Sequence, residues 1–271
     1  MRIFQILLVL SNILIYIACN PSSKKEEVQK VSKVGKFNKI ALGTCDTTGK
    51  GGVTLKVNMW EPAGTDSAST AIHDFLSTKV INRINDNADL SGIDSKSLAK
   101  ANESITSAYT LFNANYVKFK SQFPEAPGCW EIELKGDTVM ISTKIIQYQL
   151  DHYAFLGGAH GNSFRSYYVF DQQTGKEIKS NFFISDTVAL LKKAEMAFKK
   201  TENLADTTNL ETAGYFLSNH KFFISANYAF TREGIFFYYN PYEIAAYARG
   251  AITFTIPYSE LEGIVKKELI F

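Results

Sequence analysis

Apolar positions after residue 35 follow two different spacings. Spacings of three and four residues are typical of amphipathic helices, which bury one face against a core. One such stripe predicts a helix through Ile72, Phe75, Leu76, Val80 and Ile84. A longer stripe predicts a single helix that starts at Asp94 or Ser95, passes through Phe112 and ends before Pro124. A third helix is expected from Asp186 to Lys200.

Alternating apolar and polar residues predict strands, because neighbouring side chains of a strand point to opposite faces. Gly136-Asp137 predicts a hairpin turn, followed by an unusually long strand to Leu150. Along this strand the apolar positions change from odd to even numbers at Ile146, which requires a bulge or a change of partner sheet. The other predicted strands cover residues 36–42, 53–60, 129–134, 165–170, 222–230, 235–239 and 252–256.

These elements predict an α+β protein in which most strands are antiparallel. The change of face near Ile146 is interpreted as a hinge between two modules, each mainly an antiparallel sheet packed with helices. The N-terminal module is expected to cover residues 36–150 and the C-terminal module residues 151–271. Ser259 to Glu262 has the pattern of a capping box, which predicts a final helix through Leu269.

The first residues have the layout of an export signal. An uncharged apolar run of residues 3–18 follows Arg2 and stops at Cys19, with Ala18 before the cysteine and Tyr16 where Leu is usual. We therefore expect a lipoprotein signal peptide over residues 1–19, lipidation of Cys19 and a flexible tether over residues 20–35. The alternative is an uncleaved membrane anchor, for which the run is short.

Lipidation would place the protein outside the cytoplasm, attached to the cell envelope. The membrane is then a partner through the N-terminal lipid, and Asn20 after the cysteine favours the outer membrane if the cell has one. In such a compartment the two remaining cysteines, Cys45 and Cys129, are expected to form a disulfide. Two separate buried thiols or a metal half-site are the alternatives. A net charge of +2 argues against nucleic acid as a partner.

Two motifs resemble a known domain pair. They are Tyr-Ala-Phe-Leu-Gly-Gly-Ala-His-Gly at residues 153–161 and Asn-Pro-Tyr-Glu-Ile-Ala-Ala-Tyr-Ala-Arg-Gly at residues 240–250. Together they resemble the extracytoplasmic domains of RsiV-type anti-sigma factors and PdaC-type peptidoglycan deacetylases, strongly after Thr138 and weakly before it. The resemblance implies a PdaC-like N-terminal module and an RsiV-like C-terminal module. It also implies a lysozyme-like or peptidoglycan-derived partner, since RsiV-type proteins bind lysozyme outside the cell.

Neither the anti-sigma segment nor the deacetylase domain of those proteins is expected here. Only Met1 and Arg2 precede the apolar run, and the chain ends at Phe271 soon after the second motif.

The two motifs also carry the candidate ligand-binding residues. Glycines in the first motif allow a close backbone approach, so Gly157, Gly158 and His160 are either a ligand loop or a tight connection in which His160 bonds a backbone carbonyl. Tyrosine offers a large amphipathic contact surface. Tyr242, Glu243 and Tyr247 are therefore candidates for partner contact, and a rigid corner with buried rings is the alternative.

No catalytic motif is strong. The Gly-x-Ser-x-Gly elbow of hydrolases is missing, and Asp151, His152 and His160 match no common metal spacing. Glu131 and Glu133 fall on one strand face, which is more typical of a wet face than of a glycosidase pair.

We therefore expect no catalytic residue, metal site or cofactor. The sequence favours a non-enzymatic, lipid-anchored envelope protein that binds a protein or glycan. A cell-wall glycan hydrolase or deacetylase with an unrecognised site is the alternative, and a passive structural lipoprotein is a third possibility.

Overall fold

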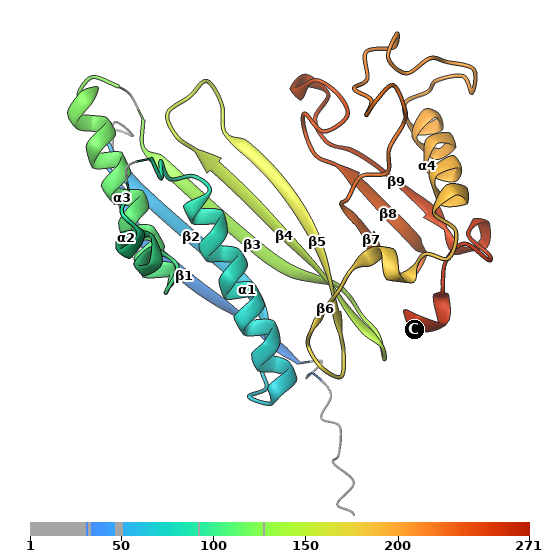
Figure 1. Cartoon of the computed structure of the whole chain (residues 1–271), viewed down its shortest axis with the longest axis horizontal. Helices are drawn as coiled ribbons and strands as arrows, with labels where there is room; N and C mark the ends of the chain where they lie inside the picture. The colour runs from blue at the N-terminus through green and yellow to red at the C-terminus, as the bar shows by residue number, and fades with distance from the viewer. Residues whose placement is uncertain (1–30, 32–33, 47–50, 92, 127) are drawn as a thin grey trace, which may run out of the picture.

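A computed structural model describes residues 31, 34–46, 51–91, 93–126 and 128–271 (Figure 1). The predicted signal peptide, Cys19 and most of the predicted tether lie outside these residues, so the predictions made for them stay predictions. Within the described part of the chain, none of the helices combines the length and apolar character needed to span a bilayer.

A six-stranded sheet, called the large sheet, carries the first half of the fold. Its strands lie in chain order, and β2 and β3 are parallel while the other neighbours are antiparallel. Parallel neighbours need a crossover connection, here supplied by α1 (Ser67–Asn85), α2 (Ser95–Ala101) and α3 (Ile105–Gln122). In Figure 1 these helices lie on one side of the large sheet. The strands are β1 (Gly35–Cys45), β2 (Gly52–Pro62), β3 (Trp130–Ile141), β4 (Ile145–Phe155), β5 (Asn162–Asp171) and β6 (Glu177–Ile178).

The single long helix predicted from Asp94 was wrong, because two helices occupy this segment. The α2 helix ends at Ala101, and the side chain of Ser104 then caps a new helix by accepting the N–H of Ser107 at 3.1 Å. Serine is a preferred N-cap because its hydroxyl oxygen satisfies a free backbone donor. The apolar stripe continues across the break, so the periodicity did not reveal it.

The hairpin predicted at Gly136-Asp137 was also wrong. Both residues lie within β3, and the chain reverses at residues 142–144 instead. Gly136 is required for a different reason, since a Cβ there would lie 2.2 Å from the hydroxyl oxygen of Tyr148. The long strand predicted to Leu150 is therefore two strands, and the change of parity falls where the chain reverses between them. The bulge that the pattern allowed is present in β3, between Thr138 and Met140.

A three-stranded sheet, called the small sheet, forms the second half of the fold. It contains β7 (Tyr228–Phe230), β8 (Gly234–Tyr239) and β9 (Ile252–Pro257), packed with α4 (Thr187–Thr201). The expected helix after Asp186 is confirmed, with Asp186 as its N-cap. The α+β class is likewise confirmed. Short 3-10 turns complete this half: η1 (Ser180–Phe183), η2 (Tyr247–Arg249), η3 (Tyr258–Glu260) and η4 (Lys267–Leu269).

Two predictions in this half were wrong. The strand expected over residues 222–230 is restricted to β7, and the final helix is replaced by η3 and η4. Gly263 adopts a φ of +73°, and Val265 then forms a β-bridge with Ile184. This pairing requires extended backbone at the position where the capping box predicted helix.

The two cores lie on opposite faces of the large sheet. The first fills the space between the sheet and α1 and α3. The second joins the small sheet and α4 to Met140, Ile145 and Val169, which belong to the large sheet. The boundary predicted between residues 150 and 151 falls inside β4, and the sheet continues through it to β6.

Two buried amide side chains connect the sheets. Gln147 on β4 donates to the carbonyl of Tyr168 at 3.1 Å and accepts the N–H of Phe230 on β7 at 3.0 Å. Asn240, directly after β8, accepts the N–H of Arg165 at 2.6 Å and donates to its carbonyl at 3.1 Å. Asn240 therefore bonds the outer edge of β5 as a neighbouring strand would.

Cys45 and Cys129 form a disulfide, as the sequence predicted. Their Cα atoms are 5.7 Å apart, and 84 positions of sequence separate them. The bridge connects the last residue of β1 to the residue before β3, so it closes a loop that contains β2 and the three crossover helices.

Replacing Gln147 with leucine should lower the free energy of unfolding by about 1–3 kcal/mol, because it leaves the buried N–H of Phe230 without a hydrogen-bond partner. Chemical denaturation would measure the loss. Gln149→Leu on the same strand is the matched control. Gln149 is only partly buried, so water can replace its bonds and a loss below about 1 kcal/mol is expected. Equal losses in the two variants would contradict the role given to Gln147.

Removing the disulfide by Cys45→Ala with Cys129→Ala should lower the free energy of unfolding by about 4 kcal/mol, from the loop entropy released in the unfolded chain. Urea denaturation of oxidised protein and of the double variant gives this difference. Reductant should destabilise the wild type and leave the double variant unchanged. If reductant also lowered the free energy of unfolding of the double variant, the sensitivity to reductant would not come from the Cys45–Cys129 disulfide.

Candidate functional site in the cleft between the sheets

A pocket of about 250 Å³ lies where the outer face of the large sheet meets the small sheet. Side chains alternate along β4, and the even-numbered ones pack under the helices. Asp151 and Tyr153 therefore face away from the helices, opposite Arg165 and Ser163 of β5 in the strand register. Tyr238 of β8 completes the wall contributed by the small sheet.

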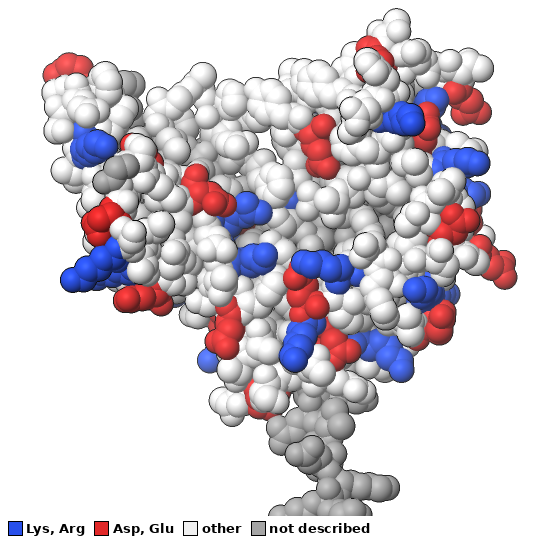
Figure 2. Space-filling view, viewed as in Figure 1, with Lys and Arg blue, Asp and Glu red and all other residues white. Residues whose placement is uncertain are grey.

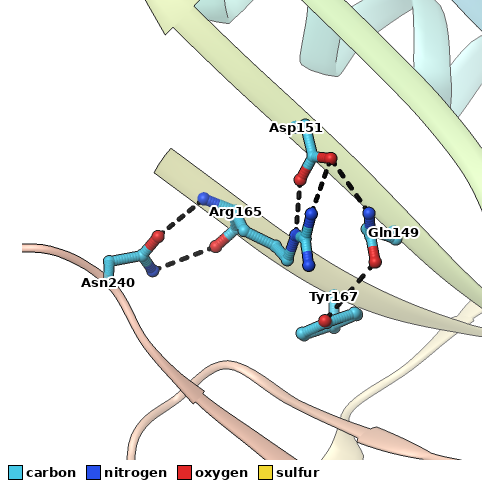
Figure 3. Close-up of polar contacts among 5 residues, drawn as sticks. All are labelled: Gln149, Asp151, Arg165, Tyr167 and Asn240. Atoms are coloured by element: carbon cyan, nitrogen blue, oxygen red, sulfur yellow. Dashed lines mark hydrogen bonds and ion pairs between the residues drawn. The ribbon is translucent and has the colours of Figure 1, made fainter. Parts of the chain in front are cut away.

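Arg165 is the centre of the polar network in this pocket (Figure 3). Its Nε and one terminal nitrogen donate to the two carboxylate oxygens of Asp151 at 2.5 and 2.9 Å. Gln149 donates to Asp151 at 2.9 Å and accepts from the hydroxyl of Tyr167 at 3.4 Å. The guanidinium carbon lies 4.8 Å from the centre of the Tyr238 ring, within cation–π range.

Hydrogen bonds with Asp151 raise the pKa of Arg165 above its usual value, so this side chain stays charged. Burial raises the pKa of Tyr238 and of Tyr167, and the nearby Arg165 opposes both shifts. These tyrosines are therefore neutral at physiological pH. Lys135 pairs with Glu133 at 3.0 Å on the same pocket wall, so the charges lining the pocket are balanced. Figure 2 shows a similar mixture of both signs over the face that it presents.

Beside the pocket lies a row of three aromatic rings, called the aromatic ledge: His160, Tyr247 and Tyr242. The His160 and Tyr247 rings stack with centroids 4.2 Å apart and an interplanar angle of 15°. The Tyr242 ring lies 5.2 Å from that of Tyr247. Tyr242 is 56% exposed and has a φ of +69°, a left-handed backbone that is unusual for a bulky residue.

The two motifs therefore meet in space, although about eighty residues separate them. The hydroxyl of Tyr247 donates to the carbonyl of Gly161 at 3.2 Å, and His160 Nδ1 lies 2.9 Å from the same oxygen. The carbonyl contact expected for a structural His160 is thus present, while the residue stays exposed. Tyr242 and Tyr247 are also not fully buried.

The glycines and Glu243 occupy different positions from the rings. Gly157 adopts a φ of +81° in the loop between β4 and β5, and Gly158 follows it exposed. Glu243 turns back and accepts the N–H of Asn240 at 2.8 Å. Its carboxylate therefore supports the turn that places Tyr242.

The other candidates from the sequence do not come together. Asp151 and His152 are adjacent on β4 and point to opposite faces, where His152 Nε2 lies 3.2 Å from the amide nitrogen of Asn87. No cluster of three or more His, Cys, Asp or Glu suitable for a metal occurs in the described ranges. Glu131 pairs with Lys56 at 2.9 Å, so Glu131 and Glu133 both have lysine partners.

Sequence reasoning missed Arg165, Gln147 and Asn240. Arg165 is the first residue of a predicted strand, with Phe164 before it and Ser166 after it, so no local pattern marks it as having a specific partner. Asn240 is the first residue of the second motif, but an amide that takes the place of a neighbouring strand leaves no periodic signal in the sequence.

Comparisons with known proteins find a match to one family model and similar folds among solved structures. A family model described as "Protein of unknown function (DUF3298)" matches residues 177–259. The fold is similar to the crystal structure of a DUF3298 family member from Bacteroides fragilis, with a TM-score of 0.61 and 18% identity over 88% of this chain and 95% of that one. A DUF3298 family protein from Pseudomonas aeruginosa gives a TM-score of 0.58 and 18% identity, over 88% of this chain and 97% of that one. The comparison with curated proteins gives no match.

The environment of His152 predicts a pH dependence of stability. Burial lowers the pKa of His152 to about 4, the positive charge of Arg83 adds to this shift, and Asp86 opposes it. An unfolded histidine has a pKa of about 6.5. Between these values the unfolded state binds more protons, so stability should fall as the pH drops from about 6.5 to about 4, by on the order of 2–3 kcal/mol.

Unfolding measured across this pH range in wild type and His152→Gln tests the assignment, and the variant should lose most of this dependence. His220→Gln, which removes an exposed imidazole, is the matched control and should keep it. An unchanged profile in His152→Gln would show that the dependence arises from other groups.

Proposed function

We propose that this chain is a non-enzymatic, lipid-anchored protein of the cell envelope whose aromatic ledge contacts a protein or glycan partner. The observation that carries the proposal is the exposed Tyr242 ring on a left-handed backbone. Such a conformation costs on the order of 1–2 kcal/mol in a residue that is not glycine. A bulky residue in this strained conformation at the surface favours a role in contact over a role in stability.

The construction of the ledge supports partner contact. Tyr242 is held by the turn that Asn240 and Glu243 fix, and its ring packs on Tyr247 and through it on His160. Aromatic side chains that are held rigid lose little conformational entropy on binding, so they provide affinity efficiently. The flat, partly exposed rings suit either the apolar face of a sugar or an interface side chain.

The disulfide supports an extracytoplasmic location. Disulfides persist in oxidising compartments and are rare in the cytosol of most organisms. A location outside the cytoplasm agrees with the lipoprotein signal proposed for residues 1–19 and with a partner such as lysozyme or a peptidoglycan fragment.

Catalysis is less well supported. Both carboxylates that line the pocket have cationic partners, Asp151 with Arg165 and Glu133 with Lys135. A general acid needs a carboxyl that holds its proton near neutral pH, and a neighbouring cation acts against this. Release of sugar or acetate from peptidoglycan by the purified protein would favour the alternative, a hydrolase or deacetylase.

The test is binding of purified protein to immobilised lysozyme and to soluble peptidoglycan fragments by interferometry. Tyr242→Asn should weaken binding tenfold or more, because it removes the exposed ring. It should also keep or raise the free energy of unfolding, by up to about 1 kcal/mol, since asparagine tolerates the left-handed backbone.

Phe123→Ala is the matched control, because Phe123 is 54% exposed at the end of α3 and should not affect binding. Saturable binding that Tyr242→Asn leaves unchanged would exclude the ledge as the contact surface. Absence of binding to both probes would remove these two partner classes.

A further inference from the structure

The small sheet has one edge that the described part of the chain leaves open. The N–H of Thr231 bonds the carbonyl of Gly234, and the N–H of Tyr238 bonds the carbonyl of Asn227, each at 2.9 Å. Alternate residues of β8 therefore bond β7, and the residues between them, such as Phe237, bond β9. It follows that Thr253 and Thr255 of β9 direct their N–H and carbonyl groups away from β8. No described residue accepts from or donates to these groups.

The opposite edge of the same sheet is blocked at one position by a side chain from the large sheet. The N–H of Phe230 points outward from β7 and is accepted by Gln147. On the large sheet, Asn240 bonds the free edge of β5 in the same way. Exposed edges are usually blocked because they can pair with another chain. Only Pro257, at the end of β9, interrupts the open edge.

A groove lies beside this open edge. It has a volume of about 720 Å³ and runs between α4 and β9. Its lining is partly apolar, with Met196 and Ala197 of α4, Leu204 after the helix, and Phe254 and Ile256 of β9, and it carries two acidic residues, Asp206 and Glu260. Met196 is 57% exposed, so a large apolar side chain faces the groove without being covered by described residues.

The rim that α4 contributes is cationic. Lys200 lines the groove and has no ion pair with any described residue. Lys193 lies on the same rim, with its nitrogen 3.9 Å from Glu260, at the limit of an ion pair. An acidic side chain could approach either lysine.

From these observations we infer that the β9 edge and the groove bind an extended peptide, independently of the aromatic ledge. The peptide adds as a fourth strand of the small sheet, bonding the outward N–H and carbonyl groups of Thr253 and Thr255. Its alternate side chains are apolar and enter the groove beside Met196, and an acidic residue pairs with Lys200. Backbone bonds provide affinity and the groove provides specificity in this mode of recognition.

A displayed library of random linear heptapeptides, selected on the purified protein, tests the inference. Selected peptides should alternate apolar residues and carry an acidic residue. Thr255→Pro removes the outward N–H without altering the ladder to β8, and should weaken their binding tenfold or more. Thr255→Ala keeps the backbone donor and should bind as the wild type does. N-methylation of the peptide amides that face β9 should match the effect of Thr255→Pro.

A second pair of variants covers the case in which Thr255→Pro does not fold. Met196→Glu places a negative charge in the groove and should weaken acidic peptides tenfold or more, while Met196→Leu should not. Failure to select any peptide, or selected peptides that respond to Tyr242→Asn and not to the Thr255 or Met196 variants, would overturn the inference. So would a dimer in sedimentation that Thr255→Pro dissociates, since a second copy would then occupy the edge.

Discussion

The arrangement of the two sheets depends on the satisfaction of strand-edge hydrogen bonds by two side-chain amides. A buried backbone donor without a partner is costly, so an edge at a sheet junction must be bonded by some other group. Gln147 supplies this group to β7 and Asn240 supplies it to β5. Because Pro241 and Tyr242 follow Asn240 directly, the bond that attaches the small sheet to β5 also fixes where the aromatic ledge stands beside the cleft. The same amide chemistry therefore determines both the fold and the geometry of the candidate site.

Elements with strong local signals could be predicted from the sequence. The α4 helix has an apolar stripe and an aspartate cap, and apolar and polar residues alternate along β9. Both elements could therefore be predicted without knowledge of distant contacts. The failures arise where a distant contact overrides a local pattern. Gly136 has the local pattern of a turn residue, but the structure requires glycine there because the Tyr148 side chain packs against it. The capping box at Ser259 does not start a helix, because Val265 pairs with Ile184 in extended backbone.

Some residues of the candidate site could also be predicted from the sequence, and others could not. His160, Tyr242 and Tyr247 could be identified as candidates from their motifs, but only the structure shows that they form one continuous row of rings. Arg165 and Asn240 could not be identified, because their importance comes from partners on other strands. Adjacent Asp151 and His152 suggested a shared role in sequence, and the alternation of β4 separates them onto opposite faces.

The amide connections cross the limits of the segment that matches the family model. Phe230 and Asn240 lie inside residues 177–259, while their partners Gln147 and Arg165 lie outside. The segment that matches the family model is therefore smaller than the unit that satisfies its own backbone hydrogen bonds. A recombination event that moved only this segment would carry an unpaired β7 edge into its new host and risk aggregation. A self-sufficient unit around the small sheet would include β4, β5 and the last residues of the chain, whose Ile270 carbonyl accepts from Ser142.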